Sequence, residues 1–207
     1  MLDTKARSIV QPIFEGVAKL FIKYNIGANK VTLLALVVGL LPSLFILINT
    51  NKFIPILLLW LSGFLDAVDG TIARKTNSST PFGTVMDIVF DRIVEVALII
   101  SLALKYSTYH LSFVILCCSI ILSMTIFLTV GAVSNKVSEK SFYYQAGLME
   151  RTEGFIMFTL IIIFPNYADL IAFVFAGTII FTAIQRFIEA YNHLSKSEFI
   201  QRKNDNK

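Results

Sequence analysis

The sequence has few charged residues and few cysteines. Only 15% of its 207 residues are charged, whereas a soluble domain carries about 25%. A small domain exposes too much surface to be covered by so few polar groups, which excludes an ordinary soluble enzyme and a disordered chain. The two cysteines, Cys117 and Cys118, are adjacent within an apolar run. This excludes a disulfide scaffold and metal-binding cysteine spacing, so both are interpreted as lipid-facing or core-packing residues.

Hydrophobic residues are abundant instead and make up 56% of the chain. This composition predicts an integral membrane protein. The net charge of +4 could suggest nucleic acid in a soluble protein. Here the basic residues lie at the ends of apolar segments, which favours contact with lipid head groups and predicts no nucleic-acid partner.

The apolar segments predict an all-α fold with six transmembrane helices and an N-terminal amphipathic helix in the membrane interface. A crossing helix needs about 20 residues. The predicted spans are about 31–50, 53–73, 83–104, 110–133, 147–164 and 167–190. Within the predicted interfacial helix (1–30), apolar residues recur at helical spacing at Val10, Ile13, Phe14, Val17, Leu20 and Phe21. The whole chain is predicted to be one domain, with the six-helix bundle over 31–192 and a polar tail over 193–207.

The distribution of lysine and arginine predicts the orientation. Basic residues gather in the N-terminal segment, in the loops after the second and fourth spans, and in the tail. The turns on the opposite side hold only Lys52 and Lys105. The positive-inside rule therefore places both termini and the two longer loops in the cytoplasm.

Carboxylates within the second and third spans carry the functional signal. Asp66 and Asp69 are three residues apart and Asp87 and Asp91 are four apart, so each pair shares one helix face. Ionisable groups at such depth are costly and mark a cavity, an ion pair or an ion site. Clustered carboxylates with no histidine or cysteine suit Mg²⁺ or Mn²⁺. Two such ions can clamp a phosphoryl group during its displacement.

Two other interpretations stay open at this point. The carboxylates could merely pair with Arg74 and Arg92, or they could serve an ion or metabolite transporter. A transporter would usually not group all its carboxylates at the cytoplasmic ends of two successive helices.

The segment from Asp66 to Asp91 resembles the signature of the CDP-alcohol phosphotransferase family. The pattern is D-x2-D-G-x2-A-R-x8-G-x3-D-x3-D, and every fixed position is present at the right spacing. The resemblance implies transfer of a phosphatidyl group from a CDP-linked lipid, such as CDP-diacylglycerol, to an alcohol, with release of CMP. It also implies a homodimer in the cell membrane with a cytoplasmic active site.

The resemblance assigns a role to each motif residue. Asp66, Asp69 and Asp87 would hold two Mg²⁺ or Mn²⁺ ions, and Asp91 would be a further ligand and the base for the acceptor hydroxyl. The nucleotide-binding residues would be Asn29, Thr32, Asp66, Asp69, Gly70, Ala73, Arg74 and Gly83. For Asn29 and Thr32, an N-cap of the first span is an equal alternative.

A phosphorylated acceptor requires basic residues near the carboxylates. The sequence offers Arg92, Lys136, Lys140, Arg151 and Arg186. For Arg151 and Arg186, the alternative is that the side chain only reaches back to the membrane interface.

The residues around Asp91 give a first indication of the acceptor. Asp91-Arg92 and the segment Glu150-Arg151-Thr152-Glu153 are similar to family members that use inositol phosphate. Members that use glycerol 3-phosphate more often carry Pro-Leu-Ala-Asp-Lys around the final aspartate, which is absent here. The predicted order is inositol phosphate or another phosphorylated polyol, then glycerol 3-phosphate, then a neutral or serine-type alcohol.

Overall fold

The structure, a computed structural model, describes residues 2–137 and 149–205. These residues form helices joined by short turns, with no strand in the described ranges, which confirms the all-α prediction. The helices are α1 (Leu2–Lys23), α2 (Ala28–Leu47), α3 (Phe53–Lys75), α4 (Pro81–Lys105), α5 (His110–Val137), α6 (Arg151–Ile163) and α7 (Ala168–Asp205). Single 3₁₀ turns at Ser107–Tyr109 (η1) and Pro165–Tyr167 (η2) precede α5 and α7.

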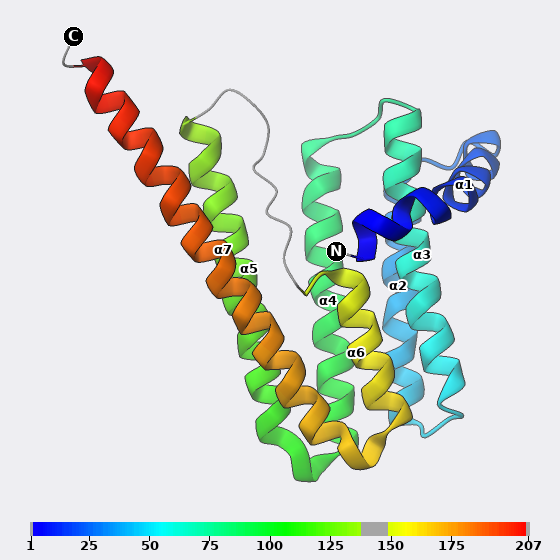
Figure 1. The fold of residues 1–207 in the computed structure, drawn as a ribbon. Coiled ribbons are helices and arrows are strands. Elements are labelled where there is room, and N and C mark those ends of the chain that lie inside the picture. The colour runs from blue at the N-terminus through cyan, green and yellow to red at the C-terminus, as the bar shows by residue number, and fades with distance from the viewer. Residues whose placement is uncertain (1, 138–148, 206–207) are drawn as a thin grey trace.

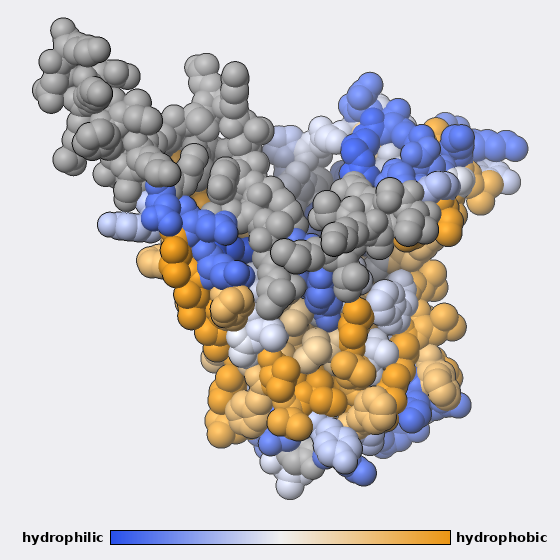
Figure 2. All heavy atoms as spheres, viewed as in Figure 1, coloured by the Kyte–Doolittle hydropathy of each residue, from blue (hydrophilic) through white to orange (hydrophobic). Residues whose placement is uncertain are grey.

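Four segments are long and apolar enough to cross a membrane. They are Ala28–Leu47, Phe53–Lys75, His110–Val133 and Pro165–Asn192. On the face in view, Figure 2 shows a band of apolar residues with hydrophilic residues at both ends, as expected for a chain surrounded by lipid. The predicted third span corresponds to α4, which carries several charges, and the fifth corresponds to α6, which has 13 residues. Helix α4 has 25 residues and is set apart from the four by its charged side chains, whereas α6 is set apart by its short length.

Helix boundaries differ from the predicted ones in two places. Helix α2 begins at Ala28, before the predicted start at 31, because Gly27 takes the extended N-cap conformation. Helix α7 continues to Asp205, so residues 193–205 are helical where a separate polar tail was predicted. The segment contains neither glycine nor proline, and polarity alone does not end a helix.

The helices pack as two groups joined through the middle of the bundle. Helix α2 packs against α3 and α4, while α5 packs along α7, and α4 and α6 connect the groups. Helix α1 lies across one end of the bundle against α3 (Figure 1). Leu59, Leu98, Phe113 and Phe158 belong to the main buried core, in which none is more than 1% exposed.

A second buried cluster and an ion pair attach α1 to the bundle. Ala18 and its neighbours pack against Leu65, Val68 and Ile72 of α3. At the end of α3, the Lys75 ammonium donates a hydrogen bond to the Glu15 carboxylate over 3.0 Å. This bond lowers the pKa of Glu15, so the pair persists at neutral pH. Helix α1 is thereby held beside the end of α3 that carries Asp66 and Asp69.

The contact among α2, α3 and α4 requires a glycine at position 39. A Cβ there would lie 2.6 Å from Ser62 Oγ and 2.6 Å from Val94 Cγ2. We expect Gly39→Ala to destabilise the protein by about 1–3 kcal/mol, because the three helices must separate. Gly177→Ala in α7 is the matched control, since its Cβ would meet nothing within 4 Å. Thermal unfolding in detergent should show a lower Tm for the first variant only, and equal Tm values would contradict this packing argument.

Candidate active site

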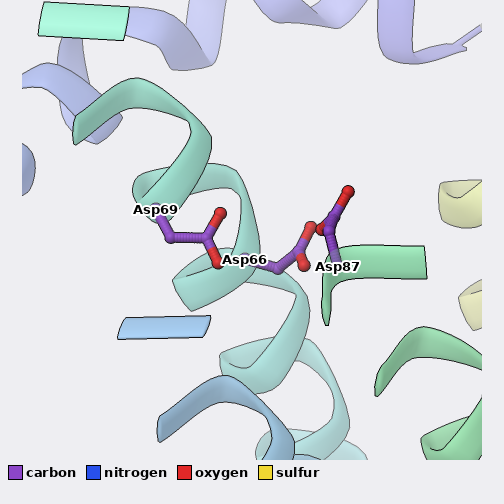
Figure 3. A group of neighbouring side chains, drawn as sticks. All are labelled: Asp66, Asp69 and Asp87. Carbon is purple, nitrogen blue, oxygen red and sulfur yellow. The ribbon is translucent and has the colours of Figure 1, made fainter. Parts of the chain in front are cut away.

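Three carboxylates from two helices meet at one end of the bundle. Asp66 and Asp69 project from the same side of α3, and Asp87 reaches toward them from the first turns of α4 (Figure 3). One oxygen from each of the three lies within 4.8 Å of the others. We call Asp66, Asp69 and Asp87 the carboxylate cluster. The two helices predicted to carry the motif thus bring together three of its four aspartates.

The carboxylate cluster fits a hard divalent cation. Its donors are all oxygen, which is the ligand set of Mg²⁺ and Mn²⁺. Asp69 is only 6% exposed, and its Oδ2 has no hydrogen-bond partner in the described part of the chain. A buried carboxylate oxygen without a partner is unfavourable unless a cation compensates it. The residues present therefore fit a metal ion.

The cluster lines a cleft of about 910 Å³ between α1, α2, α3, α4 and α6. All the residues predicted to contact the nucleotide line this cleft, namely Asn29, Thr32, Asp66, Asp69, Gly70, Ala73, Arg74 and Gly83. The cleft is therefore where the predicted nucleotide-binding residues come together, although they arise from three different helices.

Helix α4 begins at the edge of the cleft, and Gly83 in its first turn lies close to Thr80 and Asn29. Thr80 caps the helix, since its Oγ1 accepts a hydrogen bond from the Gly83 backbone N–H over 3.0 Å. A Cβ at Gly83 would lie 3.1 Å from that oxygen and 3.2 Å from Asn29 Oδ1. Gly83 thus lets α4 start directly beside α2 and aims Asp87, one turn later, into the cleft.

The N-cap alternative for Asn29 and Thr32 is wrong. Gly27 is the N-cap of α2 and makes no side-chain capping bond. The Thr32 hydroxyl donates to the Ala28 carbonyl within the helix, over 3.1 Å. Asn29 and Thr32 instead lie in the first turns of α2 and face the cleft.

Gly70 makes room for the arginine of the motif. A Cβ at Gly70 would lie 3.3 Å from Arg74 Nη1. The other terminal nitrogen, Nη2, donates to Thr71 Oγ1 over 3.1 Å. The Arg74 guanidinium is therefore laid back along α3 at the cleft wall, where a planar fork can meet a phosphate group.

Asp91 lies apart from the carboxylate cluster and pairs with an arginine distant in sequence. Arg151, the first residue of α6, directs Nη2 to Asp91 Oδ1 over 2.6 Å and Nη1 to Asp66 Oδ2. Its guanidinium also stands 5.5 Å from the centre of the Phe155 ring. Arg151 thus bridges the cluster and the remaining motif aspartate, whereas the alternative that it only reaches to the membrane interface is wrong.

Two of the other predicted acceptor residues, Arg92 and Arg186, make contacts with groups outside the carboxylate cluster. The Arg92 guanidinium pairs with Glu95 on the same helix. Arg186 of α7 lies over the Phe127 ring of α5 at 5.3 Å. Lys136 lies in the last turn of α5, but its side chain is outside the described residues, as is the whole of Lys140.

Several cleft residues were not identified from the sequence. Val10, Gln11 and Phe14 of α1 form one wall, and Trp60 and Phe155 form part of another. The apolar spacing of α1 predicted its membrane face but contained no signal that the same helix borders the site. For Trp60 and Phe155, no local pattern distinguished them from other apolar residues in the spans.

Comparison with known proteins agrees with this site. The family model described as CDP-alcohol phosphatidyltransferase matches residues 25–185. The phosphatidylinositol phosphate synthase of Corynebacterium glutamicum is 30% identical over 210 residues, which covers 96% of this chain and 93% of that protein.

Solved structures of the phosphatidylinositol phosphate synthase of Mycobacterium tuberculosis have the same fold. The complex of that enzyme with manganese and citrate aligns with a TM-score of 0.72 at 19% identity, covering 86% of this chain and 88% of the other. The structure with CDP-DAG bound aligns with a TM-score of 0.65, covering 87% and 94%. At this identity the likeness concerns the fold alone.

Proposed function

The chain belongs to the CDP-alcohol phosphatidyltransferase family, and we propose that it transfers the phosphatidyl group of CDP-diacylglycerol to a phosphorylated polyol, foremost inositol phosphate. The observation that carries this proposal is the cleft that joins the carboxylate cluster to Arg151. Family membership makes the protein a metal-dependent phosphatidyltransferase of phospholipid biosynthesis rather than a transporter.

The lining of the cleft supports a CDP-linked lipid as the donor. Val10, Phe14 and Phe64 contribute apolar surface close to the polar end formed by the carboxylate cluster and Arg74. An amphiphile with a charged diphosphate and apolar chains matches this division. The similar fold of the M. tuberculosis enzyme, solved with CDP-DAG bound, gives further support.

Asp66, Asp69 and Asp87 would hold two Mg²⁺ or Mn²⁺ ions, with Asp91 as a further ligand. When bound, such ions would neutralise the charge that develops on the CMP leaving group as the diphosphate linkage is cleaved. The similar fold that was solved with manganese supports this choice. Arg74 contributes a fixed positive charge at the same end of the cleft, and Asn29, Thr32, Gly70, Ala73 and Gly83 shape the nucleotide pocket.

Asp91 would act as the general base. Its carboxylate accepts the proton of the acceptor hydroxyl while that oxygen forms a bond to the phosphorus of the phosphatidyl group. The bond from this phosphorus to the oxygen of CMP breaks, and CMP leaves with the bridging oxygen. Arg151 Nη2 lies 2.6 Å from Asp91 Oδ1 and so holds the carboxylate in place at the edge of the carboxylate cluster.

Arg151 would bind the phosphate of the acceptor. Its guanidinium stands at the carboxylates and offers the fork geometry that recognises phosphate. Arg92, Lys136, Lys140 and Arg186 would complete a basic acceptor site. The relative in C. glutamicum, a phosphatidylinositol phosphate synthase, favours inositol phosphate over glycerol 3-phosphate and over neutral alcohols.

The membrane arrangement is part of the proposal. In this arrangement α4 and α6 cross the membrane in addition to the four apolar segments. Six crossings bring both termini to the same side, and α1 lies in the interface. The distribution of lysine and arginine favours the cytoplasmic side of the plasma membrane for the termini and the active site. A homodimer formed through the membrane helices is expected from the family.

The acceptor is tested by identifying the product. Purified protein in nanodiscs containing CDP-diacylglycerol and Mn²⁺ is given inositol 1-phosphate, inositol, glycerol 3-phosphate or serine, and the lipids are analysed by mass spectrometry. We expect phosphatidylinositol phosphate as the main product. A preference for serine or for inositol without phosphate would contradict the role of Arg151, because this half-buried arginine would then have no acceptor phosphate to bind.

A further inference from the structure

An aromatic ring fills a space on α3 that only glycine leaves open. The Phe155 ring of α6 lies against Gly63, where a Cβ would come within 2.5 Å of Phe155 Cε2 and 3.2 Å of Cδ2. Phe155 is only 5% exposed. Real Cβ atoms do not approach a neighbour at 2.5 Å, so any larger residue at position 63 must displace the ring. We call this space beside Gly63 the glycine recess.

Trp60 of α3 holds the Phe155 ring in the glycine recess and is itself tied to α6. The Trp60 ring meets it edge-on, with centres 6.1 Å apart and planes at 90°. Trp60 Nε1–H donates to Thr159 Oγ1 over 3.1 Å, which ties α3 to the next turn of α6. The orientation of the ring is therefore fixed from α3 and from its own helix.

The glycine recess and the active-site carboxylate lie on the same side of α3. Gly63 is three residues before Asp66, and Arg151 is four residues before Phe155, so each pair occupies adjacent turns on one helix face. The Phe155 ring enters the recess while the Arg151 guanidinium, 5.5 Å from the ring centre, reaches Asp66 and Asp91. The ring in the recess and the guanidinium at the carboxylates are therefore direct neighbours between α3 and α6.

We infer that Phe155, seated in the glycine recess, is a positioning residue that orients the Arg151 guanidinium and thereby sets the affinity of the site for an acceptor phosphate. The inference rests on the proposed function in assigning the acceptor phosphate to Arg151. The aromatic face attracts the guanidinium and holds its plane, so less freedom is lost when phosphate binds. Phe155 has no group that can take part in the reaction, and it acts through Arg151.

The experiment compares Phe155→Leu, Gly63→Ala and the double variant. Phe155→Leu removes the aromatic face, and Gly63→Ala displaces the ring. Each should raise the KM for inositol 1-phosphate by about 3- to 30-fold, the range expected for a cation–π contact, with a smaller change in kcat. The double variant should be no worse than Phe155→Leu alone, because leucine no longer meets the added Cβ. Gly154→Ala is the matched control, since its Cβ would make an ordinary contact at 3.6 Å with Phe175.

A binding measurement separates this inference from the proposed function. Trp60 is the single tryptophan of the chain, and its emission reports on the adjacent Phe155 ring. Titrating Mn²⁺-loaded protein with inorganic phosphate, with CMP present to fill the nucleotide pocket, gives a Kd without any turnover. We expect phosphate to bind about 3- to 30-fold more weakly to both single variants and unchanged to Gly154→Ala.

The outcomes distinguish the two claims. If wild-type protein binds phosphate but transfers nothing to inositol 1-phosphate, the proposed acceptor is overturned. In that case, weaker phosphate binding by the variants still supports the role of Phe155. Single variants with an unchanged Kd and KM overturn the positioning role. Strictly additive effects of Phe155→Leu and Gly63→Ala in the double variant also overturn the positioning role. Additivity would show that the two residues do not act through the contact between them.

Discussion

Replacing Asp87 by asparagine is expected to abolish both Mn²⁺ binding and CMP release. The amide keeps the shape of the side chain but removes the only carboxylate that α4 contributes to the carboxylate cluster. Loss of one ligand charge in a cluster built to hold a cation should lower activity by at least about 100-fold. Mn²⁺ binding is followed by electron paramagnetic resonance and activity by CMP release from CDP-diacylglycerol.

The control for Asp87 is a carboxylate at the other end of the molecule. Asp169 lies in the first turn of α7, so Asp169→Asn makes the same change in charge away from the cleft. It should retain Mn²⁺ binding and activity. If Asp87→Asn also retains Mn²⁺ affinity and activity within about threefold of wild type, the cluster does not hold the metal.

Replacing Asp91 by asparagine should stop turnover while leaving metal binding largely intact. Asp91 lies outside the carboxylate cluster and pairs with Arg151. As the general base, its loss should lower kcat by about 10²–10⁴-fold. Mn²⁺ affinity should fall less than in Asp87→Asn, because Asp66, Asp69 and Asp87 remain.

The comparison of the two asparagine variants decides the role of Asp91. CMP release in single-turnover experiments gives the rate of chemistry, and paramagnetic resonance gives the affinity for Mn²⁺. Equal losses of metal affinity in Asp87→Asn and Asp91→Asn would mean that Asp91 is chiefly a ligand. Full turnover by Asp91→Asn would contradict its role as base.

The sequence predicted the helices and the carboxylate cluster because both depend on short spacing. The three- and four-residue repeats of a helix place Asp66 and Asp69 on one face of α3. The short loop between α3 and α4 then brings Asp87 close to them. The extension of α7 was missed because polar composition was taken to end a helix. The start of α2 at Ala28 was missed because Gly27 gave no recognisable capping side chain.

The separation of Asp91 from the cluster could not be predicted from local spacing. Asp91 pairs with Arg151, which is 85 residues from Asp66 in sequence and reaches it only when α6 packs on α3. The place of Arg151 in turn depends on the fit of Phe155 against Gly63. Such close contacts between distant helices arise from side-chain packing, which leaves no periodic signal in one sequence. For the same reason, the sequence did not predict that α1 lines part of the cleft.

Restoring metal to stripped protein tests most directly whether the carboxylate cluster holds a metal used for phosphatidyl transfer. Protein stripped of metal by a chelator is placed in nanodiscs with CDP-diacylglycerol and inositol 1-phosphate, and CMP is measured as Mn²⁺ is added back. We predict no CMP without metal and saturable release with it, dependent on the acceptor. CMP release that is equally fast in stripped protein, or none from folded protein with Mn²⁺ bound, would contradict the account.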